Sequence, residues 1–206
     1  MSLFITFEGP DGSGKSTLIA KVSRYLSEKN IDFIQTREPG GTYISENIRD
    51  LLLDKENKNM SYRTEALLYA ASRAQHVDEL IRPSLDLGKI VLSDRFVLSS
   101  LAYQGAGRAL GIEQIEEINN FATGGLKPDI IFFLKIDPET TLERKRKLDT
   151  VDRLEMESVN FHEKVYKGYL DILERFKDDK NLHIIDATQG VEEVYEDVVE
   201  ILDRYL

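Results

Sequence analysis

The chain has 206 residues with 37 acidic and 27 basic side chains, which gives a net charge of −10. This length suffices for a sizeable core, and we expect one domain over residues 1–206, with room for a mobile flap. The acidic balance argues against nucleic acid as a partner, because phosphate backbones are held by basic surfaces. The absence of cysteine excludes disulfides, thiolate metal sites and cysteine nucleophiles. The first basic residue is Lys15 and no long apolar run follows it, so we expect a cytoplasmic protein with no membrane partner.

A glycine-rich loop follows the first predicted strand, Leu3–Phe7, and precedes a predicted amphipathic helix over Ser16–Lys29. The loop matches G-x-x-x-x-G-K-[ST], the phosphate-binding loop, in which backbone N–H groups surround phosphate oxygens. Lys15 adds a positive charge, and the Ser16 hydroxyl is the expected ligand of a Mg²⁺ ion carried on the nucleotide. Strand, loop and helix occur in the required order, which favours phosphate binding over a mobile turn. The residues expected around the phosphates are Gly9, Pro10, Asp11, Gly12, Ser13, Gly14, Lys15, Ser16 and Thr17.

A second short strand is predicted over Ile31–Thr36, and it ends in the turn sequence Arg37–Gly41. From the sequence alone Arg37 serves equally well as an anion contact or in a solvated salt bridge. A helix over Ser45–Leu53 follows, with Ser45 as its expected cap and Arg49 on its surface. Residues 54–61 are polar and predict a loop.

Apolar spacing predicts a helix over Thr64–Leu80, on which Tyr69 and Arg73 stand four residues apart on one face. An aromatic ring and a guanidinium so placed can hold a flat base by stacking and hydrogen bonding. Aromatic residues on such a stripe more often belong to the core, and this alternative stays open. We interpret His76 as a polar helix residue.

Lys89–Asp94 is a continuous apolar run that ends in an acid, which is typical of a central parallel strand. Asp94 would then lie at the carboxyl edge, where ligands collect in open α/β sheets. Two roles fit Asp94: ordering the magnesium shell near a phosphate loop, or capping a helix that begins near Phe96.

The second half of the chain continues the alternation of strands and helices. The cations of Arg144–Lys147 and the charged stretch that follows indicate either a solvated helix face or a mobile basic lid over about residues 142–153. The alternation predicts a doubly wound α/β domain with a parallel sheet covered on both faces. The further predicted elements are helices Ile112–Phe121, from Pro138 or Glu139 onward, Glu155–Phe176 and Val191–Tyr205, and strands Asp129–Ile136 and Leu182–Asp186.

The segment Asp94–Gln104 resembles the signature D-R-[YFH]-x-x-S-x-x-A-Y-Q of the thymidylate kinases. Arg37–Gly41 and Leu67–Arg73 resemble that family at the corresponding places, so the likeness covers nearly the whole chain. It implies the P-loop nucleoside monophosphate kinase fold, a five-stranded parallel sheet covered by helices on both faces. It also implies ATP-dependent phosphorylation of dTMP to dTDP, with Mg²⁺ as the cofactor, in a homodimer.

The same resemblance implies roles for individual residues. The catalytic set would be Lys15, Asp11, Arg95, Arg144 and Arg146, the last two in the lid. The dTMP site would consist of Asp11, Arg37, Arg49, Tyr69, Arg73, Arg95, Ser99, Tyr103 and Gln104, with Tyr69 stacked on thymine and Tyr103 under the sugar. Ser16 and Asp94 would serve the metal, and by fold analogy residues 187–191 would contact adenine.

Three positions depart from the family pattern. Gly12 stands where one subgroup has an arginine, so the lid must supply that cation, as in the bacterial subgroup. Leu148 stands where a third lid cation is expected, and Tyr69 replaces the usual phenylalanine.

Two other functions are weighed against this one. A kinase for another nucleoside monophosphate would share the loop, sheet and lid but have a different base pocket. A nucleotide-dependent switch would share only the loop, and the loop alone does not indicate whether a protein catalyses turnover. The sequence lacks N-K-x-D and any D-x-x-G outside the loop, which disfavours a GTPase switch.

Overall fold

Five parallel strands form one sheet in the order β2-β3-β1-β4-β5 in the computed structural model, which describes residues 2–137, 140–141, 153–154 and 156–206. This confirms the predicted five-stranded parallel sheet. The predicted helix start at Pro138 and the basic run Arg144–Lys147 fall outside the described residues. The strands are β1 (Leu3–Glu8), β2 (Phe33–Arg37), β3 (Ile90–Asp94), β4 (Ile130–Lys135) and β5 (Leu182–Asp186).

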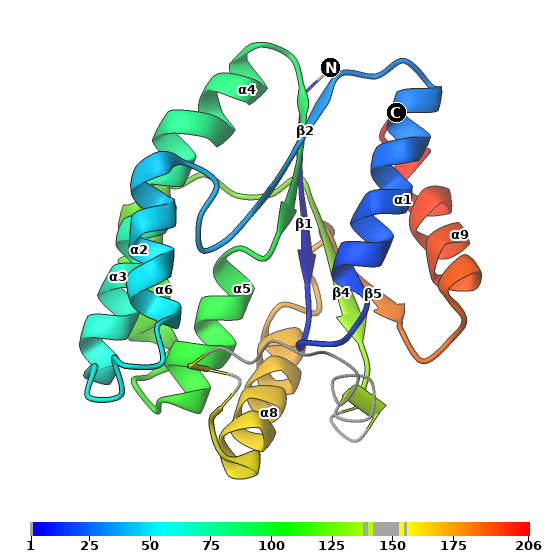
Figure 1. Cartoon of the computed structure of the whole chain (residues 1–206). Helices are drawn as coiled ribbons and strands as arrows, with labels where there is room; N and C mark the ends of the chain where they lie inside the picture. Colours follow the sequence, from blue (N-terminus) through cyan, green and yellow to red (C-terminus); the bar gives the residue numbers. More distant parts are fainter. Residues whose placement is uncertain (1, 138–139, 142–152, 155) are drawn as a thin grey trace.

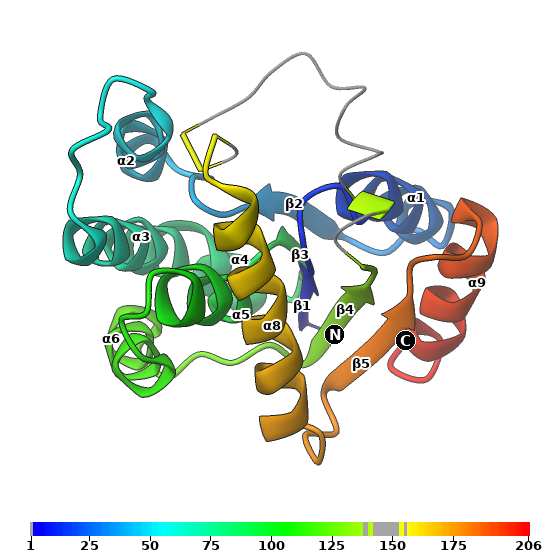
Figure 2. The same ribbon diagram turned by 90° about the horizontal axis from the view of Figure 1, so that it is seen from below.

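Helices cover both faces of the sheet, as predicted (Figures 1 and 2). Helices α1 (Lys15–Glu28) and α9 (Val191–Leu202) lie side by side on one face. The other face carries α2 (Tyr43–Leu53), α3 (Tyr62–His76), α4 (Arg82–Asp86), α5 (Val97–Ser100), α6 (Ile112–Thr123) and α8 (Val159–Arg175). Among the described helices, none combines the length and apolar character needed to cross a bilayer.

Strand β1 shows how the apolar runs are used. Ile5 and Phe7 pack into the core beneath α1 and α9, whereas Phe4 packs on the opposite face against Phe96. Side chains alternate along a strand, so Thr6 and Glu8 point to the same face as Phe4. Burial on both faces explains why this strand has a continuous apolar run rather than an alternating one.

Two helix starts differ from the prediction. Helix α2 begins at Tyr43 because Thr42 is its cap, and the Thr42 hydroxyl accepts a hydrogen bond from the Ser45 backbone N–H. The prediction of Ser45 as the cap is therefore wrong. Helix α8 begins at Val159, where the Ser158 side chain is the cap, rather than near residue 155.

Two helical segments have π-type hydrogen bonding that the sequence did not indicate. The helix predicted over Thr64–Leu80 is α-helical only to His76 and continues as the π-helix η1 (Val77–Ile81). The second, η2 (Leu101–Gly107), carries Tyr103 and Gln104. A π segment inserts an extra residue into the turn and occurs frequently at functional sites. Here it changes the direction in which two predicted ligand-binding side chains leave the helix.

Candidate active site

The strand register brings three loops to one edge of the sheet. Asp94 at the end of β3 lies opposite Phe7 on one side and opposite Arg37 on the other. The carboxyl ends of β1, β2 and β3 are therefore level, and each leads directly into a loop that carries polar or charged residues. This is the edge at which parallel sheets bind ligands.

The phosphate-binding loop depends on glycine at its two ends. Gly9 has a φ of +136°, and a side chain there would bring Cβ within 2.7 Å of the Leu134 carbonyl oxygen. Gly14 has a φ of +95° and immediately precedes α1. Left-handed backbone at these points is accessible to glycine without strain. The loop consequently leads into the N-terminus of a 14-residue helix, which favours anions.

Lys15 is buried within this loop. Its ammonium donates to the carbonyl oxygens of Gly9 (3.0 Å) and Pro10 (2.9 Å) and to the Ser13 hydroxyl at 3.4 Å. Burial and the neighbouring Arg95 lower the pKa of Lys15 to about 8, although nearby carboxylates partly compensate. A bound phosphate would give this ammonium a negatively charged hydrogen-bond partner.

The lowered pKa predicts that phosphate binding depends on pH. Below pH 8 Lys15 is protonated and attracts the ligand; above pH 8 the free protein loses this proton, whereas the complex keeps it. The association constant for ADP should therefore be level near pH 7 and fall by up to about tenfold per pH unit above 8, because one proton is then taken up on binding. Calorimetric titrations from pH 7 to 9.5 measure this.

The matched control for the pH dependence is Lys15→Arg, since a guanidinium stays charged over the whole range. Its ADP affinity should be independent of pH between 7 and 9.5, whatever its absolute value. A level profile for the unaltered protein would contradict the assignment of a lowered pKa to Lys15.

Ser16 and Asp94 form an oxygen-rich pair beside the loop. The Ser16 hydroxyl donates to Asp94 Oδ2 at 3.2 Å, and Asp94 Oδ1 is buried without a hydrogen-bond partner in the described part of the chain. Helix α5 has Phe96 at its cap position and no side-chain cap, so the capping alternative for Asp94 is wrong. A hydroxyl and a carboxylate are hard ligands that suit Mg²⁺, which retains several waters and phosphate oxygens. Within residues that the structure describes, no cluster of three or more His, Asp or Glu offers a protein-only metal cage.

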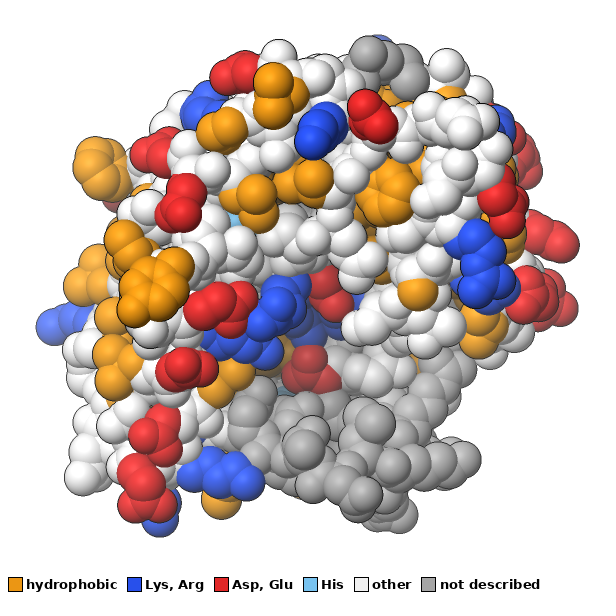
Figure 3. All heavy atoms as spheres, turned by 45° about the horizontal axis from the view of Figure 1, so that its top comes forward, with side chains coloured by type: hydrophobic (Ala, Val, Ile, Leu, Met, Phe, Trp, Pro, Cys, Tyr) orange, Lys and Arg blue, Asp and Glu red, His pale blue; other side chains and the backbone are white. Residues whose placement is uncertain are grey.

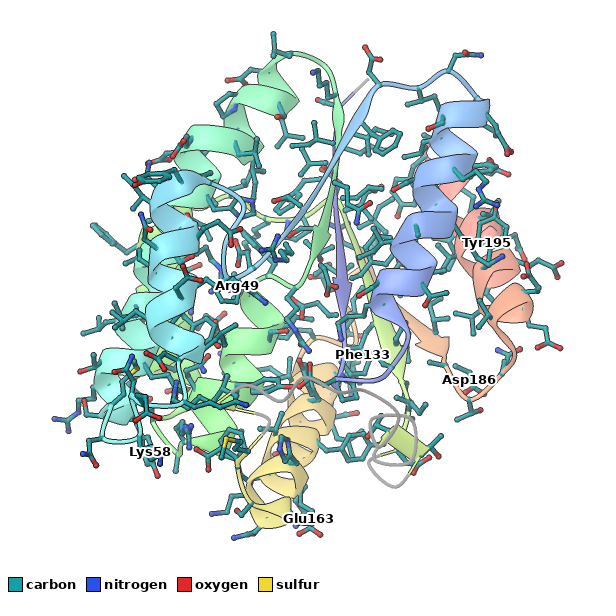
Figure 4. All side chains as sticks on the ribbon, viewed as in Figure 1. Arg49, Lys58, Phe133, Glu163, Asp186 and Tyr195 are labelled. Atoms are coloured by element: carbon teal, nitrogen blue, oxygen red, sulfur yellow. The ribbon has the colours of Figure 1, made fainter. Side chains whose placement is uncertain are left out.

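A cavity of about 160 Å³ opens next to the loop. Figure 3 shows Lys and Arg side chains together with acids in a hollow on this side of the molecule. In Figure 4, Arg49 extends from α2 toward the middle of the molecule. All nine residues predicted for the dTMP site line this one cavity: Asp11, Arg37, Arg49, Tyr69, Arg73, Arg95, Ser99, Tyr103 and Gln104.

Arg95 connects the loop to the cavity. It adopts a φ of +73°, an unusual conformation for a residue with a side chain and one that is found at functional sites. Its guanidinium contacts Asp11 and donates to Gly9 O at 3.0 Å and to Ser99 Oγ at 2.9 Å. Burial disfavours its charge, but Asp11 together with Tyr103, Tyr169 and Asp94 outweighs burial, and the pKa of Arg95 lies well above its ordinary value. Arg95 is therefore a fixed cation.

Asp11 is shared between the two halves of the site. Its Oδ1 pairs with Arg95, and its Oδ2 accepts a hydrogen bond from the Tyr103 hydroxyl at 2.9 Å. Burial raises the pKa of Tyr103 well above its usual value, so its hydroxyl remains a neutral donor. The loop acid thus sets the position of both side chains.

Arg73 lies at the inner end of the cavity and is almost fully buried. It donates to Glu38 Oε2 (2.6 Å), Ser100 Oγ (2.9 Å), the Phe96 carbonyl oxygen (2.9 Å) and Asn119 Oδ1. Four of its five N–H groups are thereby engaged by the described residues. The guanidinium is held rigidly, and its fifth N–H makes none of these four hydrogen bonds.

The interpretation of His76 as an ordinary polar helix residue is wrong. Its ring is fully buried and lies 2.7 Å from Thr36 Oγ1 and 3.0 Å from Glu38 Oε1. Because Glu38 also accepts from Arg73, His76 belongs to the set of side chains that positions the cavity's inner cation. Helical spacing alone could not place His76 next to a residue 38 positions earlier in the chain.

A buried carboxylate, Glu65, fixes Gln104. Gln104 Nε2 donates to Glu65 Oε1 at 3.1 Å, and Glu65 also accepts from Arg108 (3.0 and 3.1 Å) and from Arg153 (2.7 Å). Burial opposes its ionisation, yet the hydrogen bonds from Arg108 and Gln104 hold the pKa of Glu65 below its usual value. Arg153, the last residue of the predicted lid, is itself buried and donates to the Leu52 carbonyl oxygen at 2.7 Å. Arg144 and Arg146 of that lid lie outside the described residues.

Two further arginines lie at the outer part of the cavity, and the predicted salt bridge of Arg37 is present while its contact with an anion stays a prediction. Arg37 forms an exposed salt bridge with Glu46 at 2.9 Å and also lines the cavity. Arg49 donates to the Pro39 carbonyl oxygen at 2.7 Å and lines the same cavity. Both guanidinium groups keep further donors for an anion.

Several residues of the site were missed by the sequence analysis. Glu38, Pro39, Leu53, Ser100 and Leu154 line the cavity, and Glu8 and Tyr169 support it from behind through Ser99. The sequence contains a signal that could have identified Glu8. Like Asp94, it is an acid at the carboxyl end of an apolar strand, directly before the phosphate-binding loop.

A phosphate-binding loop between β1 and α1 and a neighbouring cavity lined by four arginines, on a five-stranded parallel sheet, define a P-loop nucleoside monophosphate kinase fold. The thymidylate kinase family profile matches residues 7–198. A thymidylate kinase of Finegoldia magna is 62% identical over 202 residues, with 98% of each chain covered. One from Lactobacillus helveticus is 53% identical over 206 residues, covering 98% of this chain and 96% of the relative. The crystal structure of thymidylate kinase from Ehrlichia chaffeensis superimposes with a TM-score of 0.78 at 33% identity and covers 98% of both chains. This chain belongs to the thymidylate kinase family.

Proposed function

We propose that this protein transfers the γ-phosphoryl group of ATP to dTMP and releases dTDP and ADP. The observation that carries this proposal is the position of Asp11, which belongs to the phosphate-binding loop and also lines the adjacent cavity. A donor nucleotide on the loop and an acceptor in the cavity would meet at Asp11 and Arg95. The family membership and the nine cavity residues support dTMP as the acceptor.

The chemistry needs cations and alignment rather than a strong base. The attacking oxygen of a nucleoside monophosphate already carries negative charge, so the main obstacle is repulsion between two polyanions. Arg95, Arg37 and Arg49 would neutralise the acceptor phosphate with planar donor pairs, and Lys15 would hold the donor phosphates. Arg144 and Arg146 of the predicted lid would cover the transferring group. Ser16 and Asp94 would hold the Mg²⁺ ion, which supplies further charge neutralisation when it is bound.

The hydrogen-bonding pattern of the cavity suits a thymine ring. Because the Glu65 carboxylate can only accept, it orients the amide of Gln104 so that Nε2 faces Glu65 and Oε1 is left to accept from a ligand. Thymine presents an N–H at ring position 3 and a carbonyl beside it. Gln104 would accept from the N–H, the remaining N–H of Arg73 would donate to the carbonyl, and Tyr69 would stack on the ring. Tyr103 would lie under the sugar, where a 2′-hydroxyl would clash.

Glu65 should therefore control base selection without touching the base. In Glu65→Gln the new side chain can donate as well as accept, and the amide of Gln104 is free to turn. Cytosine has an acceptor at ring position 3, and it would then be tolerated better. We expect the ratio of kcat/KM for dTMP to that for dCMP to fall about tenfold, the effect of roughly one hydrogen bond.

The matched control for Glu65 is Glu174→Gln, which breaks an exposed pair with Lys177 and should leave the ratio unchanged. Steady-state rates with both nucleotides measure the ratio. An unchanged ratio in folded Glu65→Gln would remove Glu65 from base selection.

The experiment that tests the function is a comparison of acceptors. Purified protein with ATP and Mg²⁺ is assayed with dTMP, dUMP, dGMP, UMP and AMP at matched concentrations. We expect the highest kcat/KM for dTMP and much lower values for the ribonucleotides. A preference for a purine acceptor would instead assign the protein to another nucleoside monophosphate.

We further propose that the protein acts as a homodimer. Large apolar side chains are exposed on three neighbouring helices: Tyr43 on α2 at 81%, Leu67 on α3 at 57% and Phe121 on α6 at 90%. Burial of such side chains is favourable, which supports a contact between two copies through these helices. Light scattering of the unaltered protein and of Phe121→Glu measures whether the dimer forms and whether it uses this surface.

A further inference from the structure

A second cavity, of about 120 Å³, lies between the sheet, the helices α5 and α6 and the segment that follows α8. Its wall is largely apolar and includes Leu98, Leu101, Ile131 and Leu182. None of the residues assigned above to ATP, dTMP or Mg²⁺ lines it. A cavity near 150 Å³ holds one benzene ring, so this space suits a ring-sized molecule.

Two polar side chains of β1 interrupt the apolar wall. Thr6 is 1% exposed, lines the cavity, and its hydroxyl has no hydrogen-bond partner among the described residues. Glu8 lies two positions further along the same face of the strand and also lines the cavity. A buried hydroxyl without a partner costs free energy that a ligand able to hydrogen bond would recover.

Glu8 is also part of the wall that separates this cavity from the acceptor site. Its Oε1 accepts from the Phe96 backbone N–H at 2.8 Å, and its Oε2 accepts from the Ser99 hydroxyl at 2.6 Å. Ser99 lines the acceptor cavity and accepts from Arg95 at 2.9 Å. The hydrogen bond from Ser99 to Glu8 therefore links the two cavities, and the contact between Arg73 and Phe96 is a second link.

We propose that the second cavity binds a small uncharged aromatic amide and that its occupancy weakens nucleotide binding at the acceptor site. The ring fills the apolar part, the amide oxygen accepts from Thr6, and the amide N–H donates to Glu8. We expect an uncharged group at Glu8, because Arg95 and Arg73 already interact with its carboxylate and oppose a second cation there. A new donor at Glu8 competes with Ser99, which loosens the support of Arg95.

Benzamide and toluene test the site, because they share a ring and differ in the amide. In ligand-observed NMR titrations we expect benzamide to bind with a dissociation constant in about the millimolar range, as its size allows. Thr6→Val keeps the shape but removes the hydroxyl, and it should weaken benzamide several-fold without weakening toluene. Its Tm should rise by about 2–4 °C, because an unpartnered buried hydroxyl is replaced.

A second variant keeps the test decisive if Thr6→Val folds poorly. Asn120 lies on the exposed side of α6 and lines the cavity, so Asn120→Trp should close the opening and abolish binding of both probes. Equal benzamide affinity in the unaltered protein and in Asn120→Trp would overturn the proposed site, as would the absence of benzamide binding to the unaltered protein.

The coupling, which rests on the proposed function, is tested by titrating dTMP with and without saturating benzamide. We expect dTMP affinity to fall about fivefold, the lower end of typical coupling between sites. In Ser99→Ala benzamide should still bind, but it should no longer change dTMP affinity. An unchanged dTMP affinity in the unaltered protein would overturn the coupling. Failure of dTMP to bind without benzamide would instead count against the proposed function.

Discussion

Lys15→Ala is expected to lower kcat by at least about a hundredfold, because a preorganised cation aimed at transferring charge contributes on that scale. Lys15 is the cation within the phosphate-binding loop, and all three of its N–H groups point at loop atoms. Steady-state assays with ATP and dTMP measure the loss. The fold should survive, since burial already disfavours the charged ammonium, and Tm should stay close to that of the unaltered protein.

The control for Lys15 is Lys21→Ala on the same helix. Lys21 forms an exposed salt bridge with Glu192 and lies outside the acceptor cavity, so kcat should not change. The affinity for ADP shows where Lys15 acts. A lower ADP affinity together with a lower kcat places Lys15 on the donor phosphates. Near-normal turnover of Lys15→Ala would refute that role.

Arg95→Ala is expected to have the largest effect on the acceptor side. The substitution removes a fixed cation and also removes the guanidinium that pairs with Asp11, so that the negative charge of Asp11 opposes an anionic phosphate more strongly. Both consequences oppose binding, and we expect kcat/KM for dTMP to fall by about a thousandfold or more, since removing one partner of a partly buried ion pair adds to the lost contact. Arg95→Lys should recover part of this, because it keeps the charge but not the planar fork.

A double substitution distinguishes the two consequences. Asp11→Ala added to Arg95→Ala removes the negative charge of Asp11, and dTMP affinity should recover relative to the single variant Arg95→Ala. Arg204→Ala, which breaks an exposed pair with Glu200, serves as the control and should bind dTMP normally. If Arg95→Ala alone binds and phosphorylates dTMP normally, Arg95 does not hold the acceptor phosphate.

Local patterns in the sequence were sufficient for the sheet and the phosphate-binding loop. Five short strand-like segments separated by helical spacing predict five parallel strands, and all five form. Asp94 was placed correctly at the carboxyl end of β3, because a strand's direction determines which end meets the ligand. The residues of the acceptor site came from resemblance to a family, and all nine line one cavity, although their individual contacts with a nucleotide remain predictions.

Other features were decided by contacts between distant parts of the chain. Helical spacing made His76 an ordinary helix residue, but packing of α3 against β2 buries it between Thr36 and Glu38. Glu65 is likewise a charged helix residue of the kind that usually faces solvent. Only the folded chain brings Gln104, Arg108 and Arg153 to its carboxylate. The π-helical turn that carries Tyr103 was likewise not indicated by the local sequence.

The sequence by itself determined the order of the elements, the phosphate-binding loop and the strand ends at which ligands collect, because these follow from periodicity and from short motifs with defined backbone requirements. The tertiary structure alone decided which polar side chains are fixed and in which direction they point. Buried donors and acceptors must find partners, and those partners come from segments far apart in the chain.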